Sequence, residues 1–238
     1  AATLCRERGP NFFTSIYASS AATYTASFYA AGQPDVMEEV WRNHVHGLLL
    51  VNPFNVGRRP ILGLDYLHTL FTTPPFALDT KSVIESSVKL CFALTDCAEH
   101  RPIYLTPESE AEVLLIARAS SAVPFMHPAV EVRGRMYKDG CFTDPLPFER
   151  ALEDGHDEVI VVSNKWPHHL GLLHRARHRH YQQWGRIEEK LSASQRIKVI
   201  RPRVRPPLVW NFDTRKARLN AMVDLGVRDA HAWLAANT

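Results

Sequence analysis

The sequence predicts a mixed α/β fold with a central, mostly parallel sheet. Short apolar runs typical of strands alternate along the chain with longer segments whose apolar residues recur at helical spacing. The consecutive β-type residues at 159–162 suit a strand that is covered on both faces. At 238 residues, the chain is long enough to bury the core of one large domain.

The elements can be placed in order from their periodicity and from the residues that interrupt it. Strands are expected at 12–18, 88–95, 158–163 and 197–200, together with a hairpin over 130–137 that turns at Gly134. Helices are expected at 1–8, 20–31, 64–71, 80–87, 108–119, 147–153, 169–191 and 214–235. This alternation of strands and helices is the pattern of layered α/β proteins.

Two helix boundaries carry specific sequence signals. Gly32 and Pro34 end the helix that begins at Ser20, as a C-terminal glycine and a following proline do. Asp35 opens the next helix, and Glu38 three residues later predicts a capping box at its start.

Composition and charge exclude several classes of protein. The hydrophobic fraction of 45% and the charged fraction of 22% are ordinary for a globular protein. The net charge of +3 permits contact with an anionic membrane surface, but neither charge nor any motif indicates nucleic-acid binding. No apolar run approaches the ~20 residues of a membrane span, and no secretory signal is visible. Because the chain starts with Ala1 rather than methionine, we expect the natural start to lie upstream.

Neither the cysteines nor the histidines indicate a metal or cofactor. The cysteines form no C-x-x-C pair, so we expect reduced thiols in a cytoplasmic protein. A cluster of histidines is interleaved with arginines and lacks a nearby carboxylate, which favours a solvated helix face over a metal site. The cluster consists of His168, His169, His174, His178 and His180.

A run of small residues marks a candidate nucleophile at the junction of the first expected strand and the helix that follows. A serine on a tight turn there has an exposed hydroxyl, and the helix directs N–H groups at it. Such an elbow needs small residues two positions before and after the serine, which Ala18 and Ala22 supply around Ser20. Centring on Ser19 would place the large Tyr17 at the first of these positions. The same run is also compatible with an ordinary helix N-cap.

A later pair of segments, 118–124 (RASSAVP) and 137–147 (YKDGCFTDPLP), carries a resemblance to a known family. With the serine elbow before them, they resemble the patatin-like phospholipases, which pair a G-x-S-x-G elbow with a later Asp-Gly motif. Here the Asp-Gly motif is Asp139-Gly140. The resemblance covers essentially the whole chain, and it implies a three-layer α/β/α fold.

The resemblance also implies an activity and its residues. Ser20 would attack an ester carbonyl of a phospholipid or related lipid, and Asp139 would accept its proton without an intervening histidine. The N–H of Ala21 would help to stabilise the oxyanion, while Ala18, Ala22 and Gly140 would shape the site. No cofactor is implied, and the partner is the lipid substrate, at a peripheral membrane contact.

The chain departs from the family pattern at three places. Ala18 and Ala22 stand where glycine is usual, and Cys141 follows Asp139-Gly140 in place of glycine or alanine. The glycine-rich oxyanion loop that precedes the elbow in the family is absent from the sequence. We therefore expect residues 1–238 to form a single patatin-like domain lacking its first strand and this loop.

Two alternatives remain open on the sequence alone. A catalytically silent patatin-like protein that binds lipid or a protein partner would account for the lost glycines. Ser-His-Asp catalysis would use His127, which lies near the Asp139 segment in the sequence.

Overall fold

The computed structural model describes residues 1–166, 179–208 and 213–237. The chain divides into two compact units. The first consists of Ala1–Pro147 and Leu208–Val223, and the second of Phe148–Pro207 and Asp224–Thr238. Every residue of the candidate site lies in the first unit.

The first unit is built on a mixed sheet with strand β2 (Lys89–Asp96) at its centre. Strand β1 (Ser15–Ser19) pairs with β2 in parallel, and β3 (Pro102–Leu105) and β5 (Arg135–Asp139) pair with it antiparallel. Strand β4 (Val130–Val132) continues the sheet beyond β5. Strand β2 is buried from its second residue onward, and six of its residues, Leu90 to Thr95, are at most 6% exposed.

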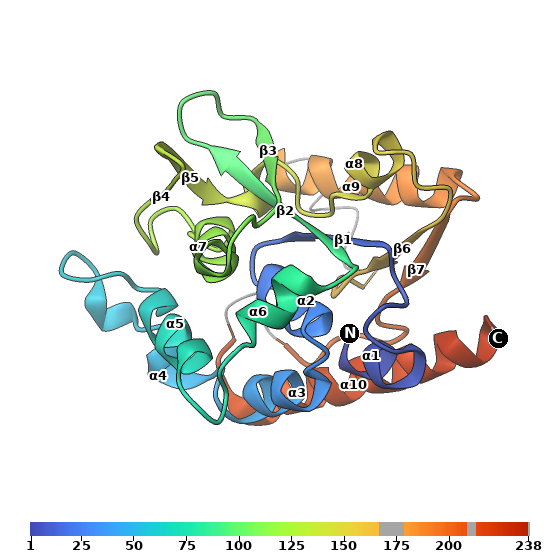
Figure 1. Cartoon of the computed structure of the whole chain (residues 1–238), viewed down its shortest axis with the longest axis horizontal. Coiled ribbons are helices and arrows are strands. Elements are labelled where there is room, and N and C mark those ends of the chain that lie inside the picture. The colour runs from blue at the N-terminus through green and yellow to red at the C-terminus, as the bar shows by residue number, and fades with distance from the viewer. Residues whose placement is uncertain (167–178, 209–212, 238) are drawn as a thin grey trace. The chain divides into compact units, whose positions relative to one another are not determined.

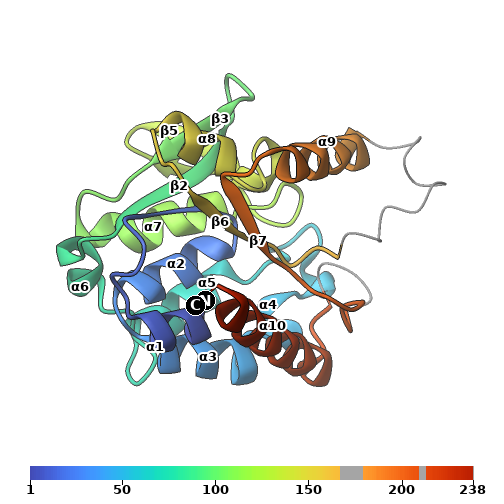
Figure 2. The ribbon, with the colours of Figure 1, turned by 90° about the vertical axis from the view of Figure 1, so that its right-hand side faces the viewer.

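Helices α2 (Ala22–Ala30) and α7 (Glu110–Ser120) cover one face of this sheet (Figures 1 and 2). Both contact β2 and they contact each other. Their buried faces pack into a continuous apolar core, in which Phe28, Phe71 and Phe92 are almost fully enclosed.

Further helices complete the first unit. They are α1 (Ala2–Arg8), α3 (Pro34–Asn43), α4 (Gly47–Leu50), α5 (Leu64–Thr72) and α6 (Thr80–Glu85), with 3₁₀ turns at η1 (Pro53–Asn55) and η2 (Gly140–Phe142). The predicted boundaries of the helices at 1–8, 64–71 and 80–87 are confirmed to within two residues.

The capping box predicted for the helix at Asp35 is wrong. Gln33 is the N-cap residue of α3, Pro34 occupies the first turn, and no side chain caps the helix. Asp35 and Glu38 instead accept charge-assisted hydrogen bonds from Arg6 of α1, at 2.9 and 2.6 Å. Pro34 has no N–H that needs a partner, so both carboxylates are available to an arginine from the neighbouring helix.

The hairpin predicted at 130–137 is confirmed, with Val132 and Arg135 paired across a two-residue turn. Arg133 and Gly134 both have positive φ, of 51° and 74°. These values match a type I′ turn, whose twist suits the flanking strands.

The second unit contains α8 (Phe148–Glu153), β6 (Val159–Val162), α9 (Arg179–Ala193) and β7 (Ile197–Ile200). Helix α10 (Lys216–Ala236) contributes its first residues to the first unit and the rest to the second. Strands β6 and β7 are parallel. Val161 is buried, but Val162 is 53% exposed, so the expectation that this strand is covered on both faces is wrong. The beginning of the helix predicted at 169–191 lies outside the described residues.

The α/β fold class predicted from the sequence is confirmed. Strand pairing in the first unit is more mixed than expected, because β2 pairs in parallel with β1 but antiparallel with β3 and β5, and β4 pairs antiparallel with β5. Short connections join β2 to β3 and β4 to β5, and such connections favour antiparallel pairing. No helix among the described residues is long and apolar enough to cross a membrane.

Candidate active site

Ser20 lies in the tight turn between β1 and α2, with a φ of 57°. Positive φ is uncommon for residues other than glycine, and such strain is concentrated at functional sites. Its N–H donates to Ser120 Oγ at 2.9 Å, and its carbonyl oxygen accepts from the N–H and hydroxyl of Thr23 at 2.9 and 2.7 Å. These bonds fix the main chain on both sides of the turn, so that the hydroxyl is free to bond elsewhere.

The N-cap interpretation of this serine run does not match the structure. Ala21 is the N-cap residue of α2, and no side chain caps the helix. The Ser20 hydroxyl donates to Asp139, and the Ser19 hydroxyl contacts Cys141 Sγ at 3.6 Å. Both hydroxyls are therefore directed at the Asp-Gly segment.

The small residues of the elbow differ in their surroundings. Ala18 is 4% exposed and packs in the core, whereas Ala21 and Ala22 are exposed at the start of α2. Because the first N–H groups of a helix have no partner within it, the Ala21 end of α2 presents amide donors beside the Ser20 hydroxyl.

Asp139 is the last residue of β5 and is 2% exposed. Its Oδ2 accepts from Ser20 Oγ at 2.7 Å, and its Oδ1 accepts from the Cys141 N–H at 2.8 Å. Its N–H donates to the Ala122 carbonyl at 3.0 Å, and its own carbonyl accepts from Thr95 Oγ1 at 2.8 Å. The carboxylate thus has little freedom to leave the serine.

Strand β2 brings the two residues together although they are 119 positions apart. Ser19 pairs with Ala93 of β2, and Asp139 pairs with the next residue, Leu94. Strand β3 occupies the opposite edge at both positions, so β1 and β5 share one edge of β2. The ends of β1 and β5 therefore meet side by side.

The electrostatic surroundings favour a basic carboxylate and an inert thiol. Burial raises the pKa of Asp139, and the hydrogen bonds from Ser20 and the Cys141 amide offset part of that rise. Burial and the neighbouring charge of Asp139 raise the pKa of the Cys141 thiol to about 12. Cys141 is therefore neutral at ordinary pH and is no competing nucleophile.

Ser120 supports the elbow, a role that the sequence analysis did not assign. It is 0% exposed, accepts from the Ser20 N–H and donates to the Ala93 carbonyl at 2.7 Å. Ser120 belongs to the serine pair of segment 118–124, but its partners are Ser20, in the turn after β1, and Ala93 of β2.

Gly140 is held in a space that no larger residue fits. A Cβ at this position would lie 2.1 Å from the Ala93 carbonyl oxygen and 2.7 Å from Ser19 Oγ. Glycine thus lets the chain after Asp139 approach β2 and the elbow together.

A second set of bonds holds the segment after Gly140, and the sequence analysis did not identify it. Thr95 Oγ1 lies 2.8 Å from Thr143 Oγ1, and the Tyr104 hydroxyl donates to Asp144 Oδ2 at 2.6 Å. These contacts tie the base segment to β2 and β3. Their only sequence signal is the polar character of residues inside otherwise apolar strands.

His127 does not join the site. His127 Nδ1 lies 2.7 Å from the Pro128 carbonyl and Nε2 lies 3.5 Å from Arg118, so neither ring nitrogen meets Ser20 or Asp139. Burial lowers the pKa of His127. The side chains of the histidine cluster at 168–180 lie outside the described part of the chain. Among the residues that the structure does describe, no group of metal-ligating side chains is found.

Comparison with known proteins places the chain in a family. Escherichia coli (strain K12) has a similar protein, the uncharacterized protein YjjU, which is 26% identical over 157 residues. The match covers 64% of this chain and 43% of YjjU, so the chain spans less than half the length of this relative. A model of the patatin-like phospholipase family matches residues 2–152, which include the elbow and the Asp-Gly segment. The chain belongs to the patatin-like phospholipase family.

Proposed function

We propose that the chain is a serine acyl hydrolase that cleaves fatty-acyl esters of phospholipids or related lipids through a Ser20–Asp139 dyad. The observation that carries the proposal is the 2.7 Å hydrogen bond from Ser20 Oγ to Asp139 Oδ2. Membership of the family supports a lipid ester as the substrate class. The cysteines form no disulfide in the described residues, as is usual in a reducing compartment, and this supports the proposal of a cytoplasmic enzyme.

The first half of the reaction acylates Ser20. As Ser20 Oγ attacks the ester carbonyl carbon, its proton passes to Asp139 Oδ2, and the carbonyl π electrons move onto oxygen. The resulting oxyanion is stabilised by the N–H of Ala21. Collapse of the intermediate breaks the bond to the alcohol, which leaves with the proton from Asp139.

The second half releases the fatty acid. Asp139 takes a proton from water, and the hydroxide attacks the acyl carbonyl carbon of the acyl-enzyme. The bond to Ser20 Oγ then breaks, the proton returns to the serine, and the carboxylic acid departs. The buried position of Asp139 keeps competing water away from the base in the first half of the cycle.

The test is hydrolysis of a medium-chain p-nitrophenyl ester by the parent, Ser20→Ala and Asp139→Asn proteins. We expect a fall of about 10³-fold or more in kcat for either variant, since a dyad acts as a unit. Ser19→Ala serves as the matched control, because Ser19 is the adjacent serine and its hydroxyl contacts Cys141 rather than Asp139. Equal rates for parent and Ser20→Ala would refute the proposal.

A catalytically silent protein that binds lipid or a protein partner is the second candidate. Ala18 and Ala22 at the elbow favour it, because glycine usually allows the close approach of backbone and substrate. A fluorophosphonate probe separates the two candidates, because it labels only an activated serine. Labelling that disappears in Ser20→Ala excludes silence, and absence of labelling in a folded parent excludes the enzyme.

The oxyanion donors offer an independent discriminator between these candidates. The reading frame upstream of Ala1 either encodes a glycine-rich run after a strand or does not. A chain extended to include such a run should acylate about 10²–10³-fold faster, the usual effect of one oxyanion donor.

A further inference from the structure

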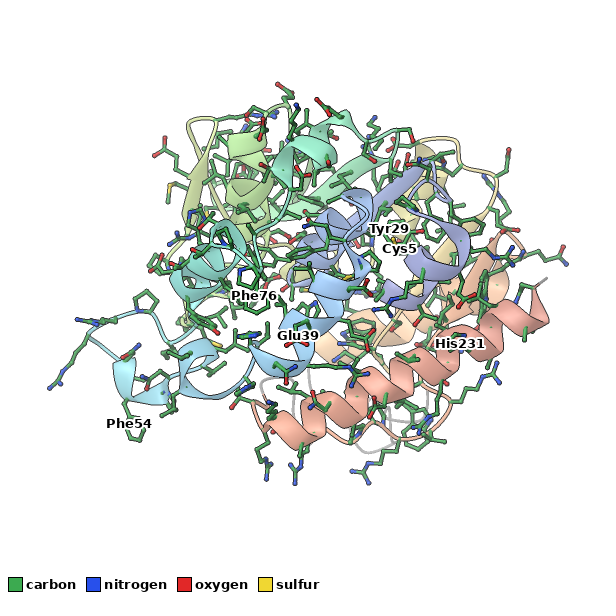
Figure 3. All side chains as sticks on the ribbon, turned by 60° about the horizontal axis from the view of Figure 1, so that its bottom comes forward. Cys5, Tyr29, Glu39, Phe54, Phe76 and His231 are labelled. Carbon is green, nitrogen blue, oxygen red and sulfur yellow. The ribbon has the colours of Figure 1, made fainter. Side chains whose placement is uncertain are left out.

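Four large apolar side chains in the short segment 48–56 face solvent. The exposed fractions are 57% for Leu48, 65% for Leu49, 80% for Phe54 and 66% for Val56. Neither α4 nor η1, the two helical turns of this segment, contributes a buried residue. Figure 3 shows Phe54 on a segment that projects from the ribbon, with its ring pointing away from the rest of the chain. We call these four side chains, with Arg58 and Arg59, the apolar tip.

The two ends of the segment that carries the apolar tip are joined by main-chain pairing between residues 50–52 and 61–63. Val51 forms a β-bridge with Leu62, and both are buried. Asn52 N–H donates to the Ile61 carbonyl, and Gly63 N–H donates to the Leu50 carbonyl, each at 2.8 Å. The exposed side chains are thus presented by an ordered main chain.

Hydrogen bonds within the projecting segment also fix its turn. The N–H groups of Arg58 and Arg59 donate to the Asn55 carbonyl at 2.9 and 3.0 Å, and the Asn55 side chain donates to the Pro60 carbonyl at 3.0 Å. The Asn52 side chain accepts from the Phe54 N–H at 3.0 Å. Several backbone N–H groups of this segment are thus satisfied internally, which lowers the cost of bringing it near an apolar phase.

The charge beside the apolar side chains has one sign. Arg58 and Arg59 are exposed, and the structure shows no ion pair to either guanidinium within its described residues. No acidic residue occurs from Gly47 to Leu64. Asp65, the first one after this stretch, is already paired with Arg118 at 2.5 Å.

We propose that the apolar tip docks this protein onto a lipid surface that carries anionic head groups. The exposed Leu, Phe and Val side chains enter the boundary of the acyl chains, and the two arginines meet the head-group phosphates and carboxylates. A second copy of the chain fits less well, because two apposed tips would bring four arginines together without a neutralising carboxylate. Docking on lipid rests on the proposed function only in that it would bring the enzyme to its lipid substrate. The exposed apolar side chains and arginines that support docking are separate from the Ser20–Asp139 pair.

The docking assay uses the full chain carrying Ser20→Ala, so that binding is read without hydrolysis. Co-sedimentation is measured with phosphatidylcholine vesicles and with vesicles that contain about one-third phosphatidylglycerol. We expect the parent to prefer the anionic vesicles, and 0.5 M salt to remove that preference, because the Debye length falls below about 5 Å. Removing apolar side chains with Leu49→Ser and Phe54→Ser should weaken binding at least about tenfold.

Charge variants test the second half of the surface. Arg58→Gln with Arg59→Gln should weaken binding to anionic vesicles by about fivefold for each arginine, and should leave binding to neutral vesicles unchanged. Lys81→Gln with Lys89→Gln removes the same charge elsewhere on the first unit and should have little effect. Met136→Ser, at a side chain that is 44% exposed on β5, is the matched apolar control.

The outcomes distinguish docking on lipid from misfolding of the variants and from self-association. Turnover of a soluble short-chain ester by tip variants with Ser20 intact should equal that of the parent, and circular dichroism should report the same fold. Docking is refuted by equal vesicle binding of the parent and the Leu49→Ser, Phe54→Ser protein, or by equal losses in the controls. A dimer of the parent that the tip variants dissociate, without vesicle binding, would assign the tip to a second copy. If the parent does not hydrolyse the ester at all, the proposed Ser20–Asp139 dyad is contradicted, but the docking proposal is not.

Discussion

At the scale of single residues, the site depends on Ser20 adopting a backbone conformation that its side chain does not favour. Its φ of 57° turns the hydroxyl away from the helix and onto the carboxylate of Asp139. Strain of this kind typically costs about 1–3 kcal/mol and persists only where the surroundings enforce it. The hydrogen bonds to Ser120 and Thr23 supply that enforcement.

The pH dependence of turnover should follow Asp139. In its proposed role as base, Asp139 acts only when ionised, and burial raises its pKa above the ordinary value of 3.8. The acid limb of kcat/KM for a soluble ester should therefore lie above pH 3.8, since this limb reports the free enzyme. A limb at or below the ordinary carboxyl value would contradict the burial of this base.

The raised pKa of Asp139 also affects stability, and there a higher pH is unfavourable although it favours turnover. A raised folded pKa means that the fold prefers the protonated acid. The contribution of Asp139 to stability is therefore fully present below its unfolded pKa and is lost as pH rises through its folded pKa. Ser20→Ala removes a hydrogen bond that lowers this pKa, so NMR titration of the carboxyl should give a higher pKa in that variant.

Ser120→Ala should lower turnover without touching the dyad. The change leaves the Ser20 N–H and the Ala93 carbonyl without their partner, which loosens the elbow. We expect kcat to fall about ten- to a hundredfold with KM little changed, because positioning rather than ground-state binding is lost. Ser27→Ala is the control, since Ser27 is equally buried and its hydroxyl donates only within α2. An equal fall in both variants would show a general loss of packing.

Gly140→Ala should abolish activity and destabilise the fold. The new methyl group would lie 2.1 Å from the Ala93 carbonyl oxygen, and neither backbone can yield without moving Asp139. We expect a loss of about 3 kcal/mol or more in urea unfolding, as for severe overpacking. Gly185→Ala in α9, where a Cβ would meet no atom within 4 Å, should instead leave stability unchanged or raise it.

At the scale of elements, the β4–β5 hairpin carries the proposed base, because its second strand ends at Asp139. Arg133 in its turn forms a two-bond contact with Glu112 of α7, at 2.8 and 2.7 Å. The same guanidinium also bonds the Thr106 carbonyl at 3.1 Å. The helix that supplies Ser120 is therefore tied to the hairpin that supplies Asp139.

Acid should weaken the ion pair between Glu112 and Arg133. Hydrogen bonds from Arg133 lower the pKa of Glu112 from 4.5 to about 2. Its contribution to stability is thus present above pH 4.5 and is lost as pH falls toward 2. Because Arg133 is partly exposed, we expect Glu112→Gln to cost only about 1 kcal/mol at neutral pH. Urea unfolding of the parent and Glu112→Gln proteins from pH 7 to 3 measures this contribution, and Glu131→Gln on the same hairpin is the control. Equal slopes of the unfolding free energy against pH in the parent and Glu112→Gln proteins would contradict a stabilising ion pair between Glu112 and Arg133.

At the scale of the whole molecule, the sequence indicates the candidate site residues but not the residues that support them. Ser20 is preferred to Ser19 because Tyr17 is too large for the elbow, and Asp139 is indicated by the resemblance of its Asp-Gly motif to the patatin-like phospholipases. The structure places the two side chains within hydrogen-bond distance, and their catalytic roles stay a prediction. Ser120 could not be assigned, since its partners are 100 and 27 residues away and meet it only once the sheet has formed.

Strand β3 and the start of α3 also differ from the sequence-based prediction, because both depend on features that the local sequence does not show. Strand β3 is four residues long and begins at Pro102, so it carries almost no periodicity. The predicted capping box does not form, because Arg6, which lies on a separate helix, binds the carboxylates of Asp35 and Glu38. Whether residues 1–238 form one domain stays a prediction, since the chain divides into two compact units that are described separately.

The main-chain carbonyl of Ala93 helps to position both Ser20 and Asp139, the two residues of the proposed dyad. It accepts from Ser120, which positions Ser20, and it limits the space at Gly140, which positions Asp139. A point substitution at Ala93 changes its side chain but keeps its main-chain oxygen as an acceptor. The spacing of Ser20 and Asp139 therefore depends less on the side chain of Ala93 than on Ser120 and Gly140, which meet that oxygen. Thr95 of β2 is a further sensitive position, because its hydroxyl donates to the Asp139 carbonyl.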